Sequence, residues 1–271
     1  MRFVLLALLM SILAGGCAAS MQQSRLEAGE HYQLAQSYLA NGSYPLAEQE
    51  IRKTIDLVSD DPRYYELLAL IYQAQGRLQP AEDAYHLALQ QKDVSPSVLV
   101  NYSTLLLLLD HLDQAIAVVQ QALRNPHYDK PERAYTNLGL AYFKKGALHQ
   151  AVEQFRIALT HQPALPEAYY NLGLAYIRLG DLERAIRALR EAVRYRPSYV
   201  DAHSSLGKAL LEAGRTEEAH LALEQVVSLG KALLKAGRTE EARLAFERVV
   251  ALAPNSDVAM TSRNQLKLLA P

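Results

Sequence analysis

A set of small, aromatic and apolar residues returns at intervals of 34 positions along this 271-residue chain. In the two most regular intervals these residues are Tyr135, Leu138, Gly139, Tyr142, Gly146, Ala151, Phe155, Ala158 and Pro163, then Tyr169, Leu172, Gly173, Tyr176, Gly180, Ala185, Leu189, Ala192 and Pro197. A fixed period of this length indicates supersecondary units that bury their apolar faces against their neighbours. The pattern therefore predicts a solenoid, an architecture typical of binding proteins.

Other intervals fall into the same register, at Tyr38, Gly42 and Ala47, at Tyr72, Gly76 and Ala81, at Leu106, Asp110 and Ala115, and at Leu206, Gly207, Leu210, Gly214 and Ala219. Gly146 and its equivalents are expected to end the first helix of each unit, and Pro163 and Pro197 to stop the second. Gly139 and Gly173 lie inside first helices, where glycine costs about 1 kcal/mol relative to alanine. We expect close contact with the second helix, at Ala151 or Ala185, to offset that cost.

These residues resemble the tetratricopeptide repeat, a helix-turn-helix unit. The resemblance implies an all-α fold, a right-handed α-solenoid of about six to seven repeats. It places the solenoid at residues 28–253, with repeats near 28–61, 62–95, 96–130, 131–165, 166–199 and 200–227 and a partial duplicate at 228–253. Residues 254–271 are expected to form a C-terminal capping helix that opens at Asn255-Ser256-Asp257.

Two irregularities interrupt the period. Ala115 and Ala151 are 36 residues apart, so two extra residues enter the proline-containing segment 125–131. Residues 205–227 recur as 228–250 with 19 of 23 positions identical, a spacing eleven residues shorter than the period. Because no proline lies between Thr216 and Ala236, we expect one fused helix there, interrupted only weakly by Gly230, and a change in the direction of the solenoid near residue 228.

The only cysteine is Cys17, which follows an apolar stretch from Phe3 to Leu13 and the small residues Ala14-Gly15-Gly16. This arrangement resembles a bacterial lipoprotein signal peptide, which implies a signal at residues 1–16, lipidation of Cys17 and a tether at residues 17–27. The apolar stretch is shorter than the roughly 20 residues that a bilayer span needs. Ala18 after the cysteine implies sorting to the periplasmic face of the outer membrane. An uncleaved anchor or an ordinary secretory signal is the alternative.

Composition and motifs argue against several other classes of protein. A net charge of −1 lacks the positive field that nucleic-acid binding needs. No two of the eight histidines are three or four residues apart, and a single cysteine excludes a cysteine-based zinc site. The chain has no H-E-x-x-H, P-loop, G-x-S-x-G or G-x-G-x-x-G motif. We therefore expect no enzyme activity, cofactor or metal.

In repeats of this family the first helices line a concave groove. The positions that would face inward, together with two of the matched asparagines, are Val100, Thr104, Leu107, Arg133, Thr136, Asn137, Leu140, Phe143, Lys144, Tyr170, Asn171, Leu174, Ile177 and Arg178. The set is mostly apolar, with Lys144 and Arg178 as a matched basic pair, and it predicts a groove for an amphipathic helix or an extended apolar segment of a protein. Two alternatives remain open: tight curvature or the chain's own termini would cover the surface, and Asn101, Asn137 and Asn171 would bond neighbouring helices rather than a ligand.

The lipoprotein signal, the short tether and about six repeats resemble the pilotin lipoproteins of type IV pilus systems, the PilF/PilW/Tgl group. The sharper part of the resemblance is Asn101-Tyr102, Tyr128 and the run Pro131-Glu132-Arg133-Ala134-Tyr135-Thr136-Asn137-Leu138-Gly139-Leu140. It implies a partner in the outer-membrane secretin, whose localisation or assembly the protein would assist. Ser103 in place of glycine and the 23-residue duplication depart from the group's pattern. The alternative is a general envelope adaptor for peptidoglycan synthesis, outer-membrane protein assembly or another secretion system.

Overall fold

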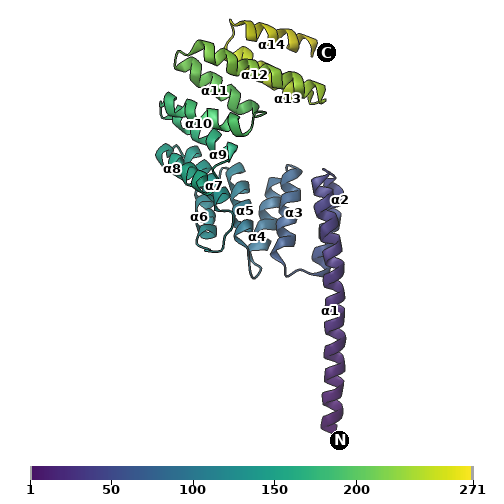
Figure 1. Ribbon diagram of the computed structural model, residues 1–271. Coiled ribbons are helices and arrows are strands. Elements are labelled where there is room, and N and C mark those ends of the chain that lie inside the picture. Colours follow the sequence, from purple (N-terminus) through teal and green to yellow (C-terminus); the bar gives the residue numbers. More distant parts are fainter. Residues whose placement is uncertain (1, 270–271) are drawn as a thin grey trace. The chain divides into compact units, whose positions relative to one another are not determined.

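The computed structural model describes residues 2–269, and the side chains of residues 21–269. Over that range the chain forms helices and turns without a strand, which confirms the all-α prediction (Figure 1). The helices are α1 (Arg2–Ala40), α2 (Tyr44–Leu57), α3 (Pro62–Ala74), α4 (Leu78–Leu89), α5 (Pro96–Leu108), α6 (Leu112–Leu123), α7 (Pro131–Lys144), α8 (Leu148–His161), α9 (Pro166–Arg178), α10 (Leu182–Tyr195), α11 (Val200–Glu212), α12 (Thr216–Lys235), α13 (Thr239–Leu252) and α14 (Asp257–Leu268). The side chains of the expected signal peptide and of Cys17 lie outside the described residues.

The helices belong to two compact units, Met1–Tyr128 with α1 to α6 and Asp129–Pro271 with α7 to α14. The division falls inside segment 125–131, where the two extra residues interrupt the 34-residue period. Within each unit consecutive helices pack against one another in pairs. The interruption of the repeat therefore coincides with the boundary between the two units.

Each first helix ends in the same backbone geometry. Gly146 has a φ of 79°, and the Ala147 N–H donates to the Tyr142 carbonyl at 2.9 Å. This bond, five residues back along the chain, is typical of the Schellman motif, which needs a left-handed residue after the helix. Asp110 fills this place in the third repeat with a φ of 62°, a conformation that aspartate tolerates better than most side chains.

The glycines inside the first helices make close contacts with large side chains. A Cβ atom added to Gly139 would lie 2.5 Å from the Phe155 ring, and one added to Gly173 would lie 2.6 Å from Leu189. The expectation of close packing against the second helix is confirmed. The expected partner is wrong for Gly139, because Phe155, four residues after the small Ala151, fills the space over the glycine. Gly207 with Leu223 and Gly230 with Phe246 repeat the contact.

In the N-terminal unit α1 packs against α2, and its first buried side chain in the described range is that of Ala28. Residues 18–27, which belong to the tether expected at residues 17–27, continue this helix. A helix rises about 1.5 Å per residue, so ten residues span about 15 Å rather than the ~35 Å of an extended chain. The spacer before the first repeat is therefore shorter than an extended one.

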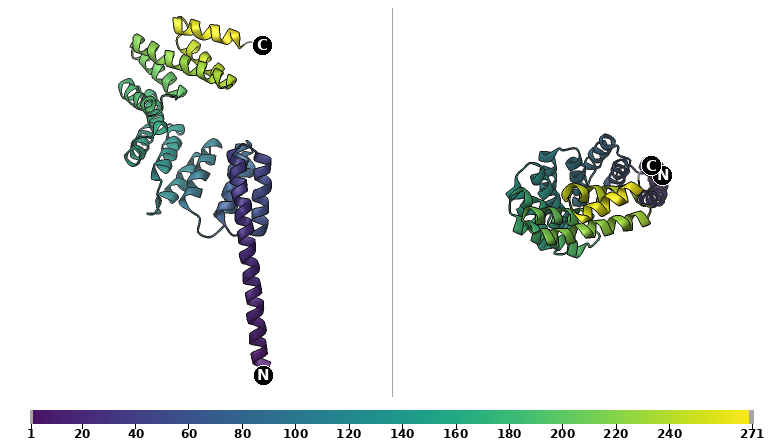
Figure 2. Two further views of the ribbon diagram at one scale, coloured as in Figure 1. Left: turned by 45° about the vertical axis from the view of Figure 1, so that its right-hand side comes forward. Right: turned by 90° about the horizontal axis from the view of Figure 1, so that it is seen from above.

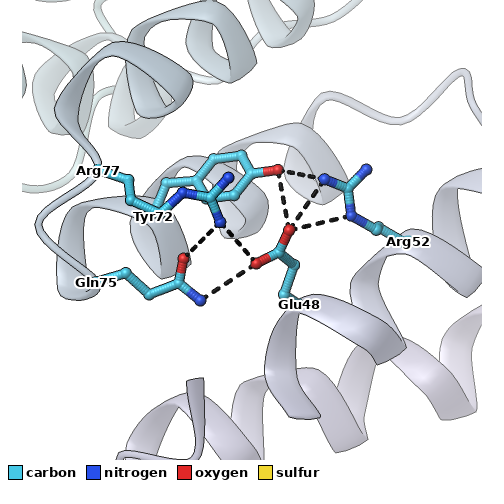
Figure 3. A network of polar contacts seen from close by, with 5 residues as sticks. All are labelled: Glu48, Arg52, Tyr72, Gln75 and Arg77. Atoms are coloured by element: carbon cyan, nitrogen blue, oxygen red, sulfur yellow. Dashed lines mark hydrogen bonds and ion pairs between the residues drawn. The ribbon is translucent and has the colours of Figure 1, made fainter. Parts of the chain in front are cut away.

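A polar network joins the first two repeats of this unit (Figure 3). The Glu48 carboxylate on α2 accepts hydrogen bonds from Arg52 at 3.0 Å, Arg77 at 3.0 Å and Gln75 at 3.2 Å. The Tyr72 hydroxyl on α3 donates to the same carboxylate at 3.3 Å, and the Arg77 guanidinium lies 4.4 Å from the centre of the Tyr72 ring. Because both oxygens of Glu48 are used, the network fixes α2 relative to α3 and to the turn that follows it.

In the C-terminal unit the junction between the two copies lies inside one unbroken helix, α12, which confirms the expected fusion (Figures 1 and 2). Its first part packs on α11 and its second part packs on α13, with Gly230 under the Phe246 ring. Helix α14 closes this unit, and its first turn is capped by the Ser256 hydroxyl, which accepts from the Ala259 N–H at 3.2 Å. This cap lies within the segment expected from the sequence.

Candidate protein-binding surface

The first helices α7, α9 and α11 of the C-terminal unit lie in a row, because α7 contacts α9 and α9 contacts α11, and α13 contacts α11 at the end of this row. We call the predicted residues of α7 and α9 on this row the first-helix face. They are Arg133, Thr136, Asn137, Leu140, Phe143 and Lys144 from α7, and Tyr170, Asn171, Leu174, Ile177 and Arg178 from α9. The structure thus brings these eleven residues together on two neighbouring helices.

The apolar members of the first-helix face are half-buried rather than fully exposed. Leu140, Phe143 and Ile177 pack against the buried cluster that contains Phe155 and Leu172. Tyr170 and Ile177 also pack against the neighbouring cluster around Leu206. Contacts between successive repeats therefore cover part of this surface, as the curvature alternative proposed, and leave a partly apolar strip.

The cations of the first-helix face already have partners. The Arg178 guanidinium lies 4.8 Å from the centre of the Phe143 ring, and it donates to the Phe143 carbonyl at 3.0 Å. Arg178 therefore covers part of the Phe143 ring and satisfies a carbonyl at the C-terminal end of α7, where a positive charge is favourable. Lys144 and Arg133 are exposed and also interact with other groups.

Tyr170 marks the α9 end of the face. Its ring lies 5.1 Å from that of Tyr199, and its hydroxyl is hydrogen-bonded to Ser205 on α11. Burial raises the pKa of the Tyr170 phenol above its usual range, and the nearby Asp201 charge acts in the same direction. The hydroxyl, protonated at neutral pH like that of any ordinary tyrosine, is already engaged with Ser205.

The three predicted residues of the N-terminal unit differ in accessibility. Val100 is fully buried and Leu107 is 6% exposed, whereas Thr104 is exposed and its hydroxyl donates to the Val100 carbonyl at 3.2 Å. The expectation that Val100 and Leu107 line an open surface is corrected accordingly. Helix α5 is apolar on most of its surface, and eight of its 13 residues, Val100 and Leu107 among them, are buried.

The matched asparagines have different surroundings. Asn101 on α5 donates to the Glu66 carboxylate on α3 at 2.6 Å, which agrees with the alternative of bonding between helices. Asn137 and Asn171 are half-buried on the first-helix face, and Asn137 interacts with another group.

A pocket of about 350 Å³ lies at the α11 end of the row. It is lined by Tyr170 of α9, by Asp201, Ser204, Ser205 and Lys208 of α11, and by Arg248, Ala251 and Leu252 of α13. Three of these residues follow residues of α9 by one period of 34 positions: Asp201 follows Glu167, Ser204 follows Tyr170 and Lys208 follows Leu174. Applying the same first-helix positions to the next repeat would therefore have identified them. Arg248 belongs to the second copy of the duplicated segment, which interrupts the 34-residue period, so the period does not predict that Arg248 lines this pocket.

The described residues show neither a metal centre nor a membrane span. They contain no group of three or more histidine, cysteine, aspartate or glutamate residues that could hold a metal ion. Among the same residues, no helix combines the length and hydropathy that a bilayer span requires. The site therefore consists of a partly apolar surface and, at one end of it, a pocket lined by apolar and charged side chains.

Three family models, each describing a tetratricopeptide repeat, match the chain. One matches residues 32–96 and 170–228, the second residues 139–180, and the third residues 227–256. Together they cover more than half of the chain, which belongs to the tetratricopeptide-repeat proteins.

Solved structures of two type IV pilus proteins have a similar fold. The structure of PilW, described as a widely conserved type IV pilus biogenesis factor, is 21% identical, with a TM-score of 0.66 over 86% of this chain and 97% of PilW. PilF of Pseudomonas aeruginosa is 18% identical, with a TM-score of 0.67 over 90% of this chain and 99% of PilF. YrrB, described as having an unusual peptide-binding site, is 20% identical, with a TM-score of 0.52 over 68% of this chain and 94% of YrrB. No curated protein sequence matches the chain.

Proposed function

We propose that this tetratricopeptide-repeat protein is a lipid-anchored periplasmic scaffold of the outer membrane that assists assembly or localisation of a type IV pilus secretin. The observation that carries the proposal is a fold similar to PilW and PilF over nearly their full lengths. The single cysteine after an apolar leader supports the anchor.

The first-helix face supports capture of a protein segment. Its apolar side chains keep part of their surface accessible, and an amphipathic helix or extended segment would cover the remainder. The cations that border the strip are held by intramolecular contacts, so apolar burial would supply most of the affinity. The lipid at Cys17 would hold the captured secretin segment near the membrane.

The decisive experiment is a chromosomal deletion in the native strain, followed by measurement of heat-stable secretin multimers and of twitching motility. Loss of both, with rescue by the intact gene, is expected. A photoreactive residue in place of Phe143 should then crosslink the secretin, whereas the same residue in place of Gln150, exposed on α8, should not. Survival of multimers and motility would overturn the pilus role, and capture of another envelope protein would favour the general adaptor.

A further inference from the structure

A second pocket, of about 640 Å³, lies at one end of the N-terminal unit. It is lined by Arg25 of α1, by residues 60–63 at the start of α3, and by residues 90–93 and Ser95 between α4 and α5. Apart from Pro62, every lining residue is polar or charged. The pocket therefore suits a small polar group rather than an acyl chain or an apolar peptide.

This pocket lies at the end of the unit from which the N-terminal part of α1 extends. Figure 1 shows the loops from α2 to α3 and from α4 to α5 at that end. Helix α1 is continuous from Cys17 to Arg25, a rise of about 12 Å. The headgroup layer on each side of a bilayer is about 5–7 Å thick, so a lipid on Cys17 would bring the headgroups within reach of long side chains at the pocket. The inference below rests on this proposed anchor.

Positive and negative side chains are equally numerous in the pocket. They are Arg25, Arg63 and Lys92 against Asp60, Asp61 and Asp93. The Arg25 guanidinium pairs with the Asp60 carboxylate at 3.0 Å, and the Arg63 guanidinium pairs with that of Asp61 at 2.6 Å. The side chains of Lys92 and Asp93 are exposed, and neither pairs with another described residue. Among the described lining residues, one free cation and one free anion therefore remain, which suits a ligand that carries both charges.

We infer that this pocket binds the phosphoethanolamine headgroup of a membrane phospholipid. The Lys92 ammonium donates to the phosphate, and the Asp93 carboxylate accepts from the ammonium group of the lipid. A phosphocholine headgroup carries the same charges, but its quaternary nitrogen has no N–H to donate, so it binds more weakly. Bound headgroups hold this end of the N-terminal unit against the bilayer, in addition to the lipid on Cys17.

The test uses vesicles with equal amounts of phosphatidylethanolamine and phosphatidylcholine. The full-length chain is reconstituted with them, and the thiol of Cys17, its single cysteine, is coupled to a maleimide lipid, so that the result does not depend on lipidation in the cell. A photoreactive residue replaces Gln90, which is exposed at the pocket, and mass spectrometry counts the lipid adducts. We expect about three- to tenfold more adduct with phosphatidylethanolamine. The same residue in place of Gln22, exposed on α1 nearer the anchor, should give equal amounts of both adducts.

Two variants separate the contributions of the two charges. Asp93→Asn should abolish the preference between the lipids, and asparagine accepts the left-handed conformation of this position, whose φ is 56°. Lys92→Gln removes the contact to the phosphate, which both lipids have, and should lower the yield of both adducts. Asp83→Asn on α4 and Lys267→Gln on α14 make the same changes at exposed positions and are the matched controls. Circular dichroism of each variant confirms folding.

Four outcomes would overturn the inference. They are equal adducts or none at position 90, a preference that survives Asp93→Asn, a larger yield with phosphatidylglycerol when it replaces phosphatidylcholine, and adducts with free phosphoethanolamine but not with lipid. The third would indicate attraction of any anion, and the fourth would assign the pocket to a soluble ligand. None of them bears on lipidation of Cys17 or on secretin assembly, which are measured separately by fractionation and in the deletion strain.

Discussion

At the scale of single residues, four glycines and four large side chains set the distance between paired helices in the C-terminal unit. Each glycine stands 16 residues before its partner, from Gly139 with Phe155 to Gly230 with Phe246. The conformational cost of glycine inside a helix is offset by burial of the larger side chain over it. The duplicated copy keeps the pair while Leu223 becomes Phe246, so the contact accepts either shape of side chain.

The first prediction concerns Gly139→Val. The new Cβ atom would lie 2.5 Å from the fully buried Phe155 ring, so we expect a loss of about 1–3 kcal/mol in the free energy of unfolding. Gly29→Val is the matched control, because nothing lies within 4 Å of its Cβ position. Thermal melts followed by circular dichroism should show a lower midpoint for the first variant only, and equal melts would contradict the packing argument.

The second prediction concerns the Glu48 network. Burial raises the pKa of the Glu48 carboxyl, but hydrogen bonds from Arg52 and Gln75 and the charge of Arg77 outweigh burial and hold the pKa below its usual 4.5. A depressed pKa in the folded state contributes stability that is complete above the unfolded value and is lost as pH falls through the folded one. Glu48→Gln should therefore cost about 1 kcal/mol at neutral pH, because Arg52 and Arg77 are largely exposed.

Denaturant titrations at several pH values test this linkage. The difference between wild type and Glu48→Gln should be constant above about pH 5 and shrink steadily as the solution becomes more acidic. Glu27→Gln, the same change at an exposed position of α1, should leave stability unaltered throughout. A difference that grows on acidification would rule out the network as its source.

At the scale of elements, α12 serves two helix pairs at once. Its first part is the second helix of the pair with α11, and its last part takes the place of a first helix for α13. The eleven residues missing between the copies would have held the turn that separates these roles.

The third prediction is that Ser228→Pro, in the middle of α12, costs about 3 kcal/mol or more in the free energy of unfolding. Proline at this exposed position removes a hydrogen bond of a continuous helix, whereas a turn would accept it. Thr216→Pro at the first position of the same helix is the control and should be nearly neutral. Chemical denaturation compares the two, and tolerance of Ser228→Pro would mean that the helix is broken there.

Much of this architecture could be predicted from local sequence signals. The helix ends at Gly146 and Gly180, the fusion across Gly230 and the cap at Ser256 each depend on a few neighbouring residues. Features that depend on packing between helices could not be predicted in this way. The period did not show that Phe155 covers Gly139, nor that Arg248 would meet Asp201 across 47 residues. The apolar α5 offered no contrast between faces, so the burial of Val100 was missed.

At the scale of the whole molecule, the net charge is close to zero although the two units carry opposite net charges. The net charge of −1 arises from an acidic N-terminal unit and a basic C-terminal unit. Partners that recognise charge would therefore distinguish the units, although the overall composition suggests no such preference.

The fourth prediction concerns attachment of the whole molecule to the membrane. Cys17→Ser removes the thiol that the proposal assigns to the lipid, so the protein should move from the outer-membrane fraction to the soluble periplasmic fraction. Stable anchoring by lipid depends on the attached acyl chains, and under the proposal Cys17 is the residue that would carry them. Fractionation followed by immunoblotting checks this, with Ser20→Ala in the same segment as control. Retention of Cys17→Ser in the outer membrane would show that another element anchors the chain.

The shared helix α12 also has a consequence for how the C-terminal end opens. In an ordinary repeat array the terminal unit can detach alone, because each unit contacts only its neighbours. Here α13 and α14 cannot lose their support without disturbing the same helix that covers α11. Amide protons from α11 to α14 should therefore exchange with solvent deuterium as one block with a common opening free energy, while those of α1 and α2 exchange separately.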